Sequence, residues 1–304
     1  MESFFLILLY LAIGALCKRI KRFGPETPAV LNTFVLYIAL PALILQKIPS
    51  LQFSADLLIP ALVPWLLLLI VVMLILAISR YLKWSKEVTV ALLIVLPLGN
   101  TSFLGFPMIS AFFGDSYLPY ALIYDQVGSF VALATYSTML AAVYSPNHTS
   151  TDVGWSARAM LMKIITFPPF IALVIALLMR GLPYPSLLQS LINQLAATLV
   201  PLIMIAVGYS FQWGFSGERF SPIAVGLTIK LMLMPFLVWV GCYSLGLSGK
   251  AVDVTIFEAA MPPMISAGAI AITAGLAPRM VTALVGFGLM ASFVTLPFWY
   301  WVLR

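Results

Sequence analysis

The sequence reads LPLGNTSFLGFP over residues 96–107 and EAAMPPMISAG over residues 258–268. Each stretch places prolines, glycine and small polar residues in the middle of an otherwise apolar run. Proline lacks a backbone N–H and clashes with the preceding helical turn, so it interrupts a helix. We therefore expect both stretches to be breaks within long apolar helices.

The composition around these stretches indicates a membrane protein. Of the 304 residues, 62% are hydrophobic and 9% are charged, whereas about 25% of the residues of a soluble domain are charged. So few charges cannot cover the surface of a soluble protein, and the surface must face lipid. One histidine and two cysteines, Cys17 and Cys242, supply neither a disulfide framework nor a His/Cys metal site. The predicted fold is an all-α membrane protein.

Ten apolar runs are candidates for transmembrane helices. A bilayer core of about 30 Å requires roughly 20 apolar residues in each helix. The predicted spans are 3–17, 28–46, 56–79, 87–112, 116–143, 160–180, 185–212, 221–247, 251–275 and 280–303.

The positive charges predict the orientation of these spans. Most of the 16 Lys and Arg residues fall in loops on one side of the membrane, and the opposite side has only Lys47, Arg180, Lys250 and Arg304. Cytoplasmic loops are enriched in Lys and Arg, so we expect both termini outside the cytoplasm, in a plasma membrane such as a bacterial inner membrane. The net charge of +6 lies mostly in these loops and gives no indication of nucleic-acid binding.

The chain resembles itself after about 161 residues. Asn32 aligns with Asn193 at this offset, and residues 100–102 align with residues 261–263. Five is an odd number of spans, so the second half enters the membrane from the opposite side, as in many secondary transporters. We predict one five-helix repeat over residues 1–143, a short cytoplasmic linker over residues 144–157 and an inverted five-helix repeat over residues 158–304.

The two interruptions occupy equivalent places in helices 4 and 9. Unpaired backbone groups at bilayer depth are tolerated only where they line a cavity or meet another group. We predict that the broken helices cross, with Gly99, Pro107, Pro262 and Pro263 forming the crossover. Positive helix N-termini at the crossing favour an anion, and helix C-termini favour a cation. Two separate proline kinks are the alternative.

Three charged residues lie well inside predicted spans, where a charge costs about 2.5–3.5 kcal/mol and usually has a function. Glu258 precedes the second break by one turn and is a candidate to bind Na⁺ or a proton, or to pair with Lys230. Asp125 is a candidate coupling or substrate residue, or a buried hydrogen-bonding support. Lys230 either neutralises an acidic side chain, attracts a carboxylate substrate or snorkels to the surface.

The stretch GNTSFLGFP over residues 99–107 resembles the GNxxfxGxP signature of the auxin efflux carrier family, which includes plant PIN carriers and bacterial malate or malonate permeases. Residues 31–32, 40–42, 258–262 and 295–297 also resemble the family pattern. The resemblance covers essentially the whole chain. Because the long central loop of many plant members is absent, the chain is most similar to compact bacterial members.

This resemblance implies a scaffold built from spans 1, 2, 6 and 7 and a transport domain built from spans 3, 4, 5, 8, 9 and 10. The implied substrate-binding residues are Asn100, Thr101, Ser102, Met261, Pro262, Pro263 and Ser266. Lys230, the lysine inside span 8, is added to them as a candidate for binding a carboxylate. A more distant resemblance to bile-acid sodium symporters places Glu258 at a sodium-binding position. The implied coupling-ion residues are Glu258, Asp125 and Asn100, with Na⁺ as the only candidate metal ion and no other cofactor.

The expected function is elevator-type secondary active transport of a small organic anion, such as malate, malonate or an auxin-like acid, coupled to Na⁺ or H⁺. The alternative is a uniporter driven by the membrane potential. An intramembrane aspartyl protease is disfavoured because residues 112–115 read FFGD and lack the first glycine of the GxGD motif. The expected partners are the organic anion and the lipid bilayer, and a homodimer through the scaffold spans is a further candidate.

Overall fold

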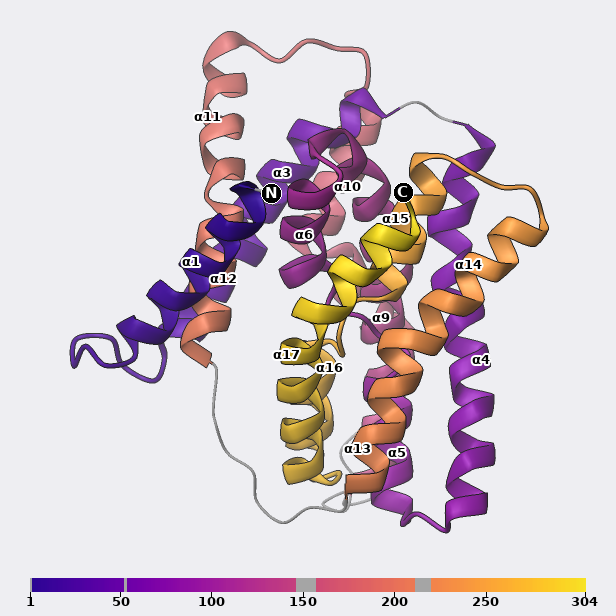
Figure 1. Cartoon of the computed structure of the whole chain (residues 1–304). Helices are drawn as coiled ribbons and strands as arrows, with labels where there is room; N and C mark the ends of the chain where they lie inside the picture. The colour runs from indigo at the N-terminus through magenta and orange to yellow at the C-terminus, as the bar shows by residue number, and fades with distance from the viewer. Residues whose placement is uncertain (1, 52–53, 146–156, 211–219) are drawn as a thin grey trace. The chain divides into compact units, whose positions relative to one another are not determined.

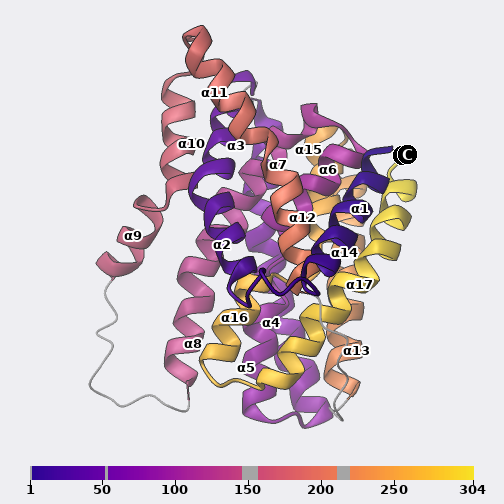
Figure 2. The same ribbon diagram turned by 90° about the vertical axis from the view of Figure 1, so that its left-hand side faces the viewer.

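The computed structural model describes residues 2–51, 54–145, 157–210 and 220–304 (Figures 1 and 2). These residues form helices and no β-strand, which confirms the all-α fold for the described ranges. The chain forms two compact units. The first unit comprises Met1–Ser54, Ser102–Leu122 and Leu161–Gln212, and the second comprises Ala55–Thr101, Ile123–Met160 and Trp213–Arg304. Most of the predicted linker, residues 146–156, lies outside the described residues.

The first unit is a helical bundle. Its helices are α1 (Glu2–Cys17), α2 (Thr27–Phe34), η1 (Val35–Ala39), α3 (Leu40–Lys47), η2 (Ile48–Ser50), α6 (Phe106–Phe112), η5 (Asp115–Tyr117), α10 (Pro168–Leu178), α11 (Ser186–Ala197) and α12 (Leu199–Ser210). Helix α12 packs against α1 and α2, α3 packs against α10 and α11, and α6 packs against α1. The unit boundaries fall within η4 (Thr101–Gly105), α7 (Leu118–Ile123) and α9 (Ala157–Ile165).

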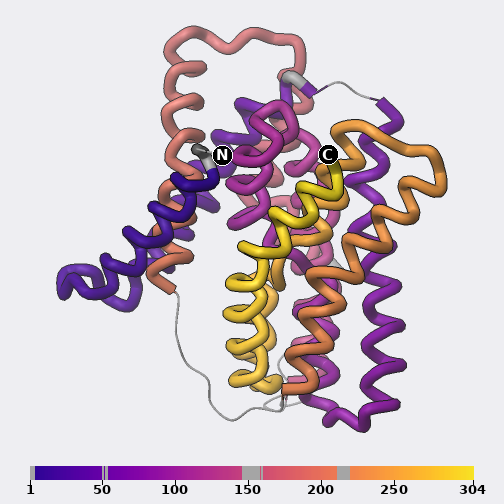
Figure 3. Tube along the Cα trace, in the orientation of Figure 1, coloured from indigo at the N-terminus to yellow at the C-terminus, as the bar shows by residue number. Residues whose placement is uncertain are grey.

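The second unit contains the two longest helices, α4 (Leu58–Leu82) and α17 (Pro278–Val302). Its other helices are η3 (Ala55–Leu57), α5 (Lys86–Val95), η6 (Tyr124–Phe130), η7 (Leu133–Ser137), α8 (Thr138–Tyr144), α13 (Phe220–Thr228), η8 (Ile229–Leu233), α14 (Met234–Ser244), α15 (Lys250–Ala259) and α16 (Ile265–Thr273). Helix α4 packs against α5, η6 and α15. Helix α16 runs beside α17, as the tube in Figure 3 shows, and also contacts α5.

Six continuous helical segments are long and apolar enough to cross a membrane, which confirms a multi-pass membrane protein. They are Thr27–Lys47, Ala55–Leu82, Asp115–Tyr144, Ser186–Ser210, Phe220–Ser244 and Pro278–Val302. The other four predicted spans are short or interrupted. Span 6, for example, changes direction at Phe167, which has extended backbone before Pro168 at the start of α10. The ten-helix inverted repeat stays a prediction.

Several helices contain a π-helical turn directly before a proline. The segments η1, η4 and η8 are π-helical, and Pro41, Pro107 and Pro235 follow them within two residues. A proline clashes with the carbonyl four residues earlier, and a widened turn moves that carbonyl away. In η8 the carbonyl of Leu231 accepts a hydrogen bond of 2.9 Å from the indole N–H of Trp299. The prolines thus create π turns, which often occur at functional sites.

Helices α1 and α12 approach each other so closely that their glycines have no room for a side chain. A Cβ atom at Gly14 would overlap the backbone carbonyl of Ile205, and one at Gly208 would overlap the carbonyl of Leu11. Small residues allow this close approach between membrane helices. The two glycines therefore set the separation of α1 and α12 within the first unit.

We predict that Gly14→Ala lowers the free energy of unfolding by about 1–3 kcal/mol, because the added methyl group overpacks the contact with α12. Thermal unfolding of the purified protein in detergent measures the change. Gly286→Ala is the matched control, because a Cβ atom at Gly286 in α17 would have no neighbour within 4 Å. Equal stability of G14A and the native protein would contradict the close contact.

Candidate functional site

The two predicted interruptions meet within the second unit. Helix α5 ends at Val95, and α15 ends at Ala259 before α16 begins at Ile265. Between these ends, the backbone N–H of Asn100 donates to the carbonyl oxygen of Pro262 over 2.8 Å, and the N–H of Met264 donates to the carbonyl of Leu98 over 3.0 Å. These bonds bracket an antiparallel bridge between Gly99 and Pro263. We call this pair of segments the crossing.

The crossing favours glycine at position 99 because neighbouring atoms approach this position closely. A Cβ atom there would lie 3.2 Å from the carbonyl oxygen of Glu258, 3.3 Å from the ammonium nitrogen of Lys230 and 3.3 Å from Cβ of Met261. Pro263 is also confined, since a Cβ atom at Gly288 of α17 would overlap its ring. Glycine and proline together therefore let two extended segments replace helical hydrogen bonds with bonds to each other.

Glu258 lies in the last turn of α15, directly before this break, and its side chain is 0% exposed. Neither carboxylate oxygen has a hydrogen-bond partner. The charges of Asp125 and Lys230 both act on this carboxylate. A buried charged group without hydrogen bonds is costly, so Glu258 is the strongest candidate for an ion-binding residue among the described residues of the second unit.

Lys230 lies in the π-helical segment η8 and is 1% exposed. Its ammonium group donates to the sulfur of Met234 over 3.6 Å and interacts electrostatically with Glu258. The sequence left open whether this lysine snorkels to the surface, and its burial contradicts that possibility. Lys230 instead supplies a positive charge beside the crossing, next to Gly99.

Asp125 differs from Glu258 because both of its oxygens accept hydrogen bonds. The hydroxyl of Thr101 donates to Oδ1, and the side-chain amide of Gln126 donates to Oδ2 over 2.7 Å. Asp125 and Gln126 lie in the π-helical segment η6 and are each 1% exposed. Asp125 thus connects η6 to Thr101, the residue that follows Asn100.

Two side-chain amides near this network keep an unpaired polar atom. The amide nitrogen of Asn100 and the amide oxygen of Gln126 are buried and have no hydrogen-bond partner. An amide N–H can donate to a carboxylate, and an amide oxygen can bind a hard cation. Sequence reasoning did not select Gln126, whose position beside Asp125 was the only available signal.

The remaining predicted residues divide between the two units. Met261, Pro262 and Pro263 are buried in the crossing, and Ser266 lies partly exposed in the first turn of α16. Ser102 and Pro107 belong to the first unit. The prediction that Pro107 forms part of the crossover is wrong, because it is the second residue of α6, after the crossing has ended. No group of three or more His, Cys, Asp and Glu side chains suitable for a metal ion occurs in the ranges that the structure describes.

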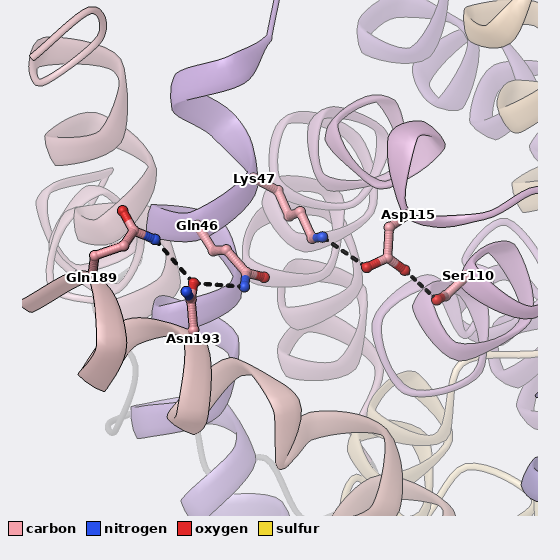
Figure 4. A network of polar contacts seen from close by, with 6 residues as sticks. All are labelled: Gln46, Lys47, Ser110, Asp115, Gln189 and Asn193. Atoms are coloured by element: carbon pink, nitrogen blue, oxygen red, sulfur yellow. Dashed lines mark hydrogen bonds and ion pairs between the residues drawn. The ribbon is translucent and has the colours of Figure 1, made fainter. Parts of the chain in front are cut away.

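A second polar cluster lies in the first unit and was not predicted (Figure 4). The ammonium group of Lys47, at the end of α3, forms an ion pair of 2.8 Å with Asp115 of η5, and the hydroxyl of Ser110 donates to the same carboxylate. The side chain of Lys47 is 19% exposed, and that of Asp115 is 60% exposed.

Three amide side chains complete this cluster (Figure 4). Gln46 of α3 and Gln189 of α11 each donate over 2.9 Å to the side-chain oxygen of Asn193. The side chain of Asn193 therefore joins α11 to α3 through Gln46. The side-chain oxygen of Asn32, its predicted counterpart, is buried and has no partner.

Comparison with known proteins identifies the family. The model of a family described as "Membrane transport protein" matches residues 1–300. An uncharacterized transporter of Methanothermobacter thermautotrophicus is 25% identical, and the alignment covers 99% of this chain and 98% of the relative. An uncharacterized transporter of Methanocaldococcus jannaschii is 22% identical over 100% of this chain and 98% of the relative. The chain therefore belongs to the membrane transport protein family, the family of the auxin efflux carriers, and is a membrane transporter.

Proposed function

We propose that the protein is a secondary active transporter for a small organic anion, coupled to Na⁺ or H⁺ in the plasma membrane. The observation that carries this proposal is Glu258, a fully buried carboxylate without hydrogen-bond donors, one turn from a pair of interrupted helices. Intramembrane acidic residues commonly bind coupling ions, and interrupted helices bind substrates in many secondary transporters. Malate, malonate and an auxin-like acid are the substrate candidates.

An importer of anions requires a coupling ion because the membrane potential opposes the entry of negative charge. One elementary charge that crosses 100 mV changes its free energy by about 2.3 kcal/mol, and a negative-inside potential opposes anion entry. A proton or Na⁺ bound at Glu258 would compensate one negative charge of the anion. Asp125 and Asn100 complete the proposed coupling site, with the hydrogen bonds of Asp125 holding Thr101 and Gln126 in place.

The substrate would bind at the crossing. The unpaired amide nitrogen of Asn100 and the positive charge of Lys230 are suited to a carboxylate. Backbone and side-chain atoms of neighbouring residues in the second unit complete the proposed site, namely Thr101, Met261, Pro262, Pro263 and Ser266.

An elevator-type motion is the proposed mechanism of alternating access. It is supported by the composition of the two units, because predicted spans 1, 2 and 7 and most of span 6 belong to the first unit, and spans 3, 8, 9 and 10 belong to the second. Spans 4 and 5, which the prediction assigns to the transport domain, are divided between the two units at residues 101/102 and 122/123. The crossing and its buried charges belong entirely to the second unit. The second unit is thus the proposed moving part and the first unit the proposed scaffold, through which a second copy of the chain would bind.

Uptake of radiolabelled malonate or malate into proteoliposomes tests the function. Saturable uptake that increases with an imposed Na⁺ or H⁺ gradient supports a coupled transporter. Saturable flux that responds only to the membrane potential would identify a uniporter and overturn the coupling proposal. Absence of saturable flux for the carboxylates would contradict the proposed substrate class.

We predict that Glu258→Gln abolishes the response to the coupling ion while the protein still folds. In the native protein a tenfold ion gradient is worth about 1.4 kcal/mol and raises accumulation by up to about tenfold for a one-to-one stoichiometry. In E258Q the same gradient should change accumulation by less than about twofold. The matched control is Glu87→Gln, an exposed glutamate in the first turn of α5. Native gradient dependence in E258Q would remove Glu258 from the coupling site.

We also predict that Asn100→Ala weakens substrate binding. Loss of one hydrogen bond to a charged group is worth about 1.5–3 kcal/mol, so the Kd should rise at least about tenfold. Scintillation-proximity binding to the purified protein measures this change. Gln194→Ala, which removes an exposed amide from α11, is the control and should bind normally. Native affinity in N100A would exclude its amide from the substrate site.

A further inference from the structure

The first unit contains a pocket that the proposed transport mechanism does not use. Its volume is about 180 Å³, and its walls come from α3, α6, η5, α7, α11 and α12. Pockets for drug-sized ligands measure about 300–1,000 Å³, so this pocket has room only for a small molecule. Its floor is apolar and buried, with Leu43, Phe106, Leu118 and Leu199 each less than 7% exposed.

The polar part of the pocket carries one positive and one negative charge. Lys47 and Asp115 both line the pocket and form the ion pair of 2.8 Å shown in Figure 4. Ser110, Gln46 and Asn193 add neutral hydrogen-bonding groups to the lining. The charged lining is therefore balanced, in contrast to the crossing, where two acidic side chains accompany one lysine.

Solvent screens the ion pair on the side of Asp115, whose side chain is 60% exposed, whereas the side chain of Lys47 is 19% exposed. A solvent-screened ion pair contributes modestly to stability, so a ligand with matching charges can replace it at a modest cost. A ligand that replaces the ion pair meets one positive and one negative charge in the same small pocket. A lone anion would satisfy Lys47 and be repelled by Asp115, and a lone cation would do the reverse.

The geometry points to a binding site for a small free zwitterion of the amino-acid type in this pocket. The ligand's carboxylate replaces Asp115 beside Lys47, and its ammonium group binds Asp115. Any short aliphatic side chain of the ligand contacts the apolar floor formed by Leu43 and Phe106. The site lies wholly within the first unit and does not depend on the proposed function of the crossing.

Isothermal titration of the full-length protein in detergent, without added lipid, tests this site. The probes are L-alanine, propionate, which lacks the ammonium group, and ethylamine, which lacks the carboxylate. Because each charged hydrogen bond contributes strongly, L-alanine should bind at least about tenfold more tightly than either of the other probes. Equal binding of propionate or ethylamine, or no saturable binding of L-alanine, overturns the proposal without the need for a variant.

Single substitutions then test the two charges. Lys47→Met and Asp115→Asn should each weaken L-alanine binding about tenfold or more, and D115N should bind propionate more tightly than the native protein does. Lys163→Met, an exposed lysine of α9 in the same unit, is the matched control. L-alanine binding that survives in both K47M and D115N would place the ligand elsewhere.

Two further variants separate this site from misfolding and from the crossing. The double substitution Lys47→Asp with Asp115→Lys keeps both charges, so it should restore the preference for L-alanine that either single substitution removes. Glu258→Gln, in the second unit, should leave L-alanine binding unchanged. Failure of the exchange to restore the preference, or loss of binding in E258Q, would contradict an independent zwitterion site.

Discussion

The architecture of the second unit depends on how backbone groups are paired where proline ends a helix. Pro262 and Pro263 have no N–H to donate, and unpaired groups at bilayer depth cost several kcal/mol each. The N–H of Asn100 donates to the carbonyl of Pro262, and the N–H of Met264 donates to the carbonyl of Leu98. Each interrupted helix therefore supplies hydrogen-bond partners for the other. Without the second interruption, the first would leave these backbone groups unpaired. The remaining polar atoms of the crossing stay available to a ligand.

The two buried acidic residues near the crossing differ in their hydrogen bonds, and this difference indicates different roles. Asp125 accepts hydrogen bonds from two neutral side chains, so its charge is stabilised without a ligand. Glu258 is equally buried and has no hydrogen bond. Lys230 contributes one positive charge to two acidic groups, which leaves the cluster one positive charge short when all three are ionised. A proton or a monovalent cation would remove this deficit, and this requirement links the local electrostatics to coupled transport.

The crossing could be predicted from sequence because its causes are local, namely Gly99, Pro262 and Pro263 at matched positions in apolar runs. The burial of Glu258 followed from its position in one of those runs, whereas the sequence left open whether Lys230 is buried or snorkels to the surface. The π-helical turns were not predicted, although Pro41, Pro107 and Pro235 now explain three of them. The ion pair of Lys47 with Asp115 joins residues 68 positions apart, and no periodicity relates such residues. Hydropathy also could not show that span 6 turns at Phe167, since both sides of that turn are apolar.

The most direct test of the central claim is a cryo-electron-microscopy map of the protein in lipid nanodiscs, recorded with saturating malonate and Na⁺ at a resolution that defines side chains. We predict non-helical backbone over residues 98–100 and 262–264, with the two segments in contact. It also predicts density for a bound ion or solute beside Glu258 and Asn100. Continuous helices through either segment, or a Glu258 carboxylate fully hydrogen bonded by protein groups, would contradict the account.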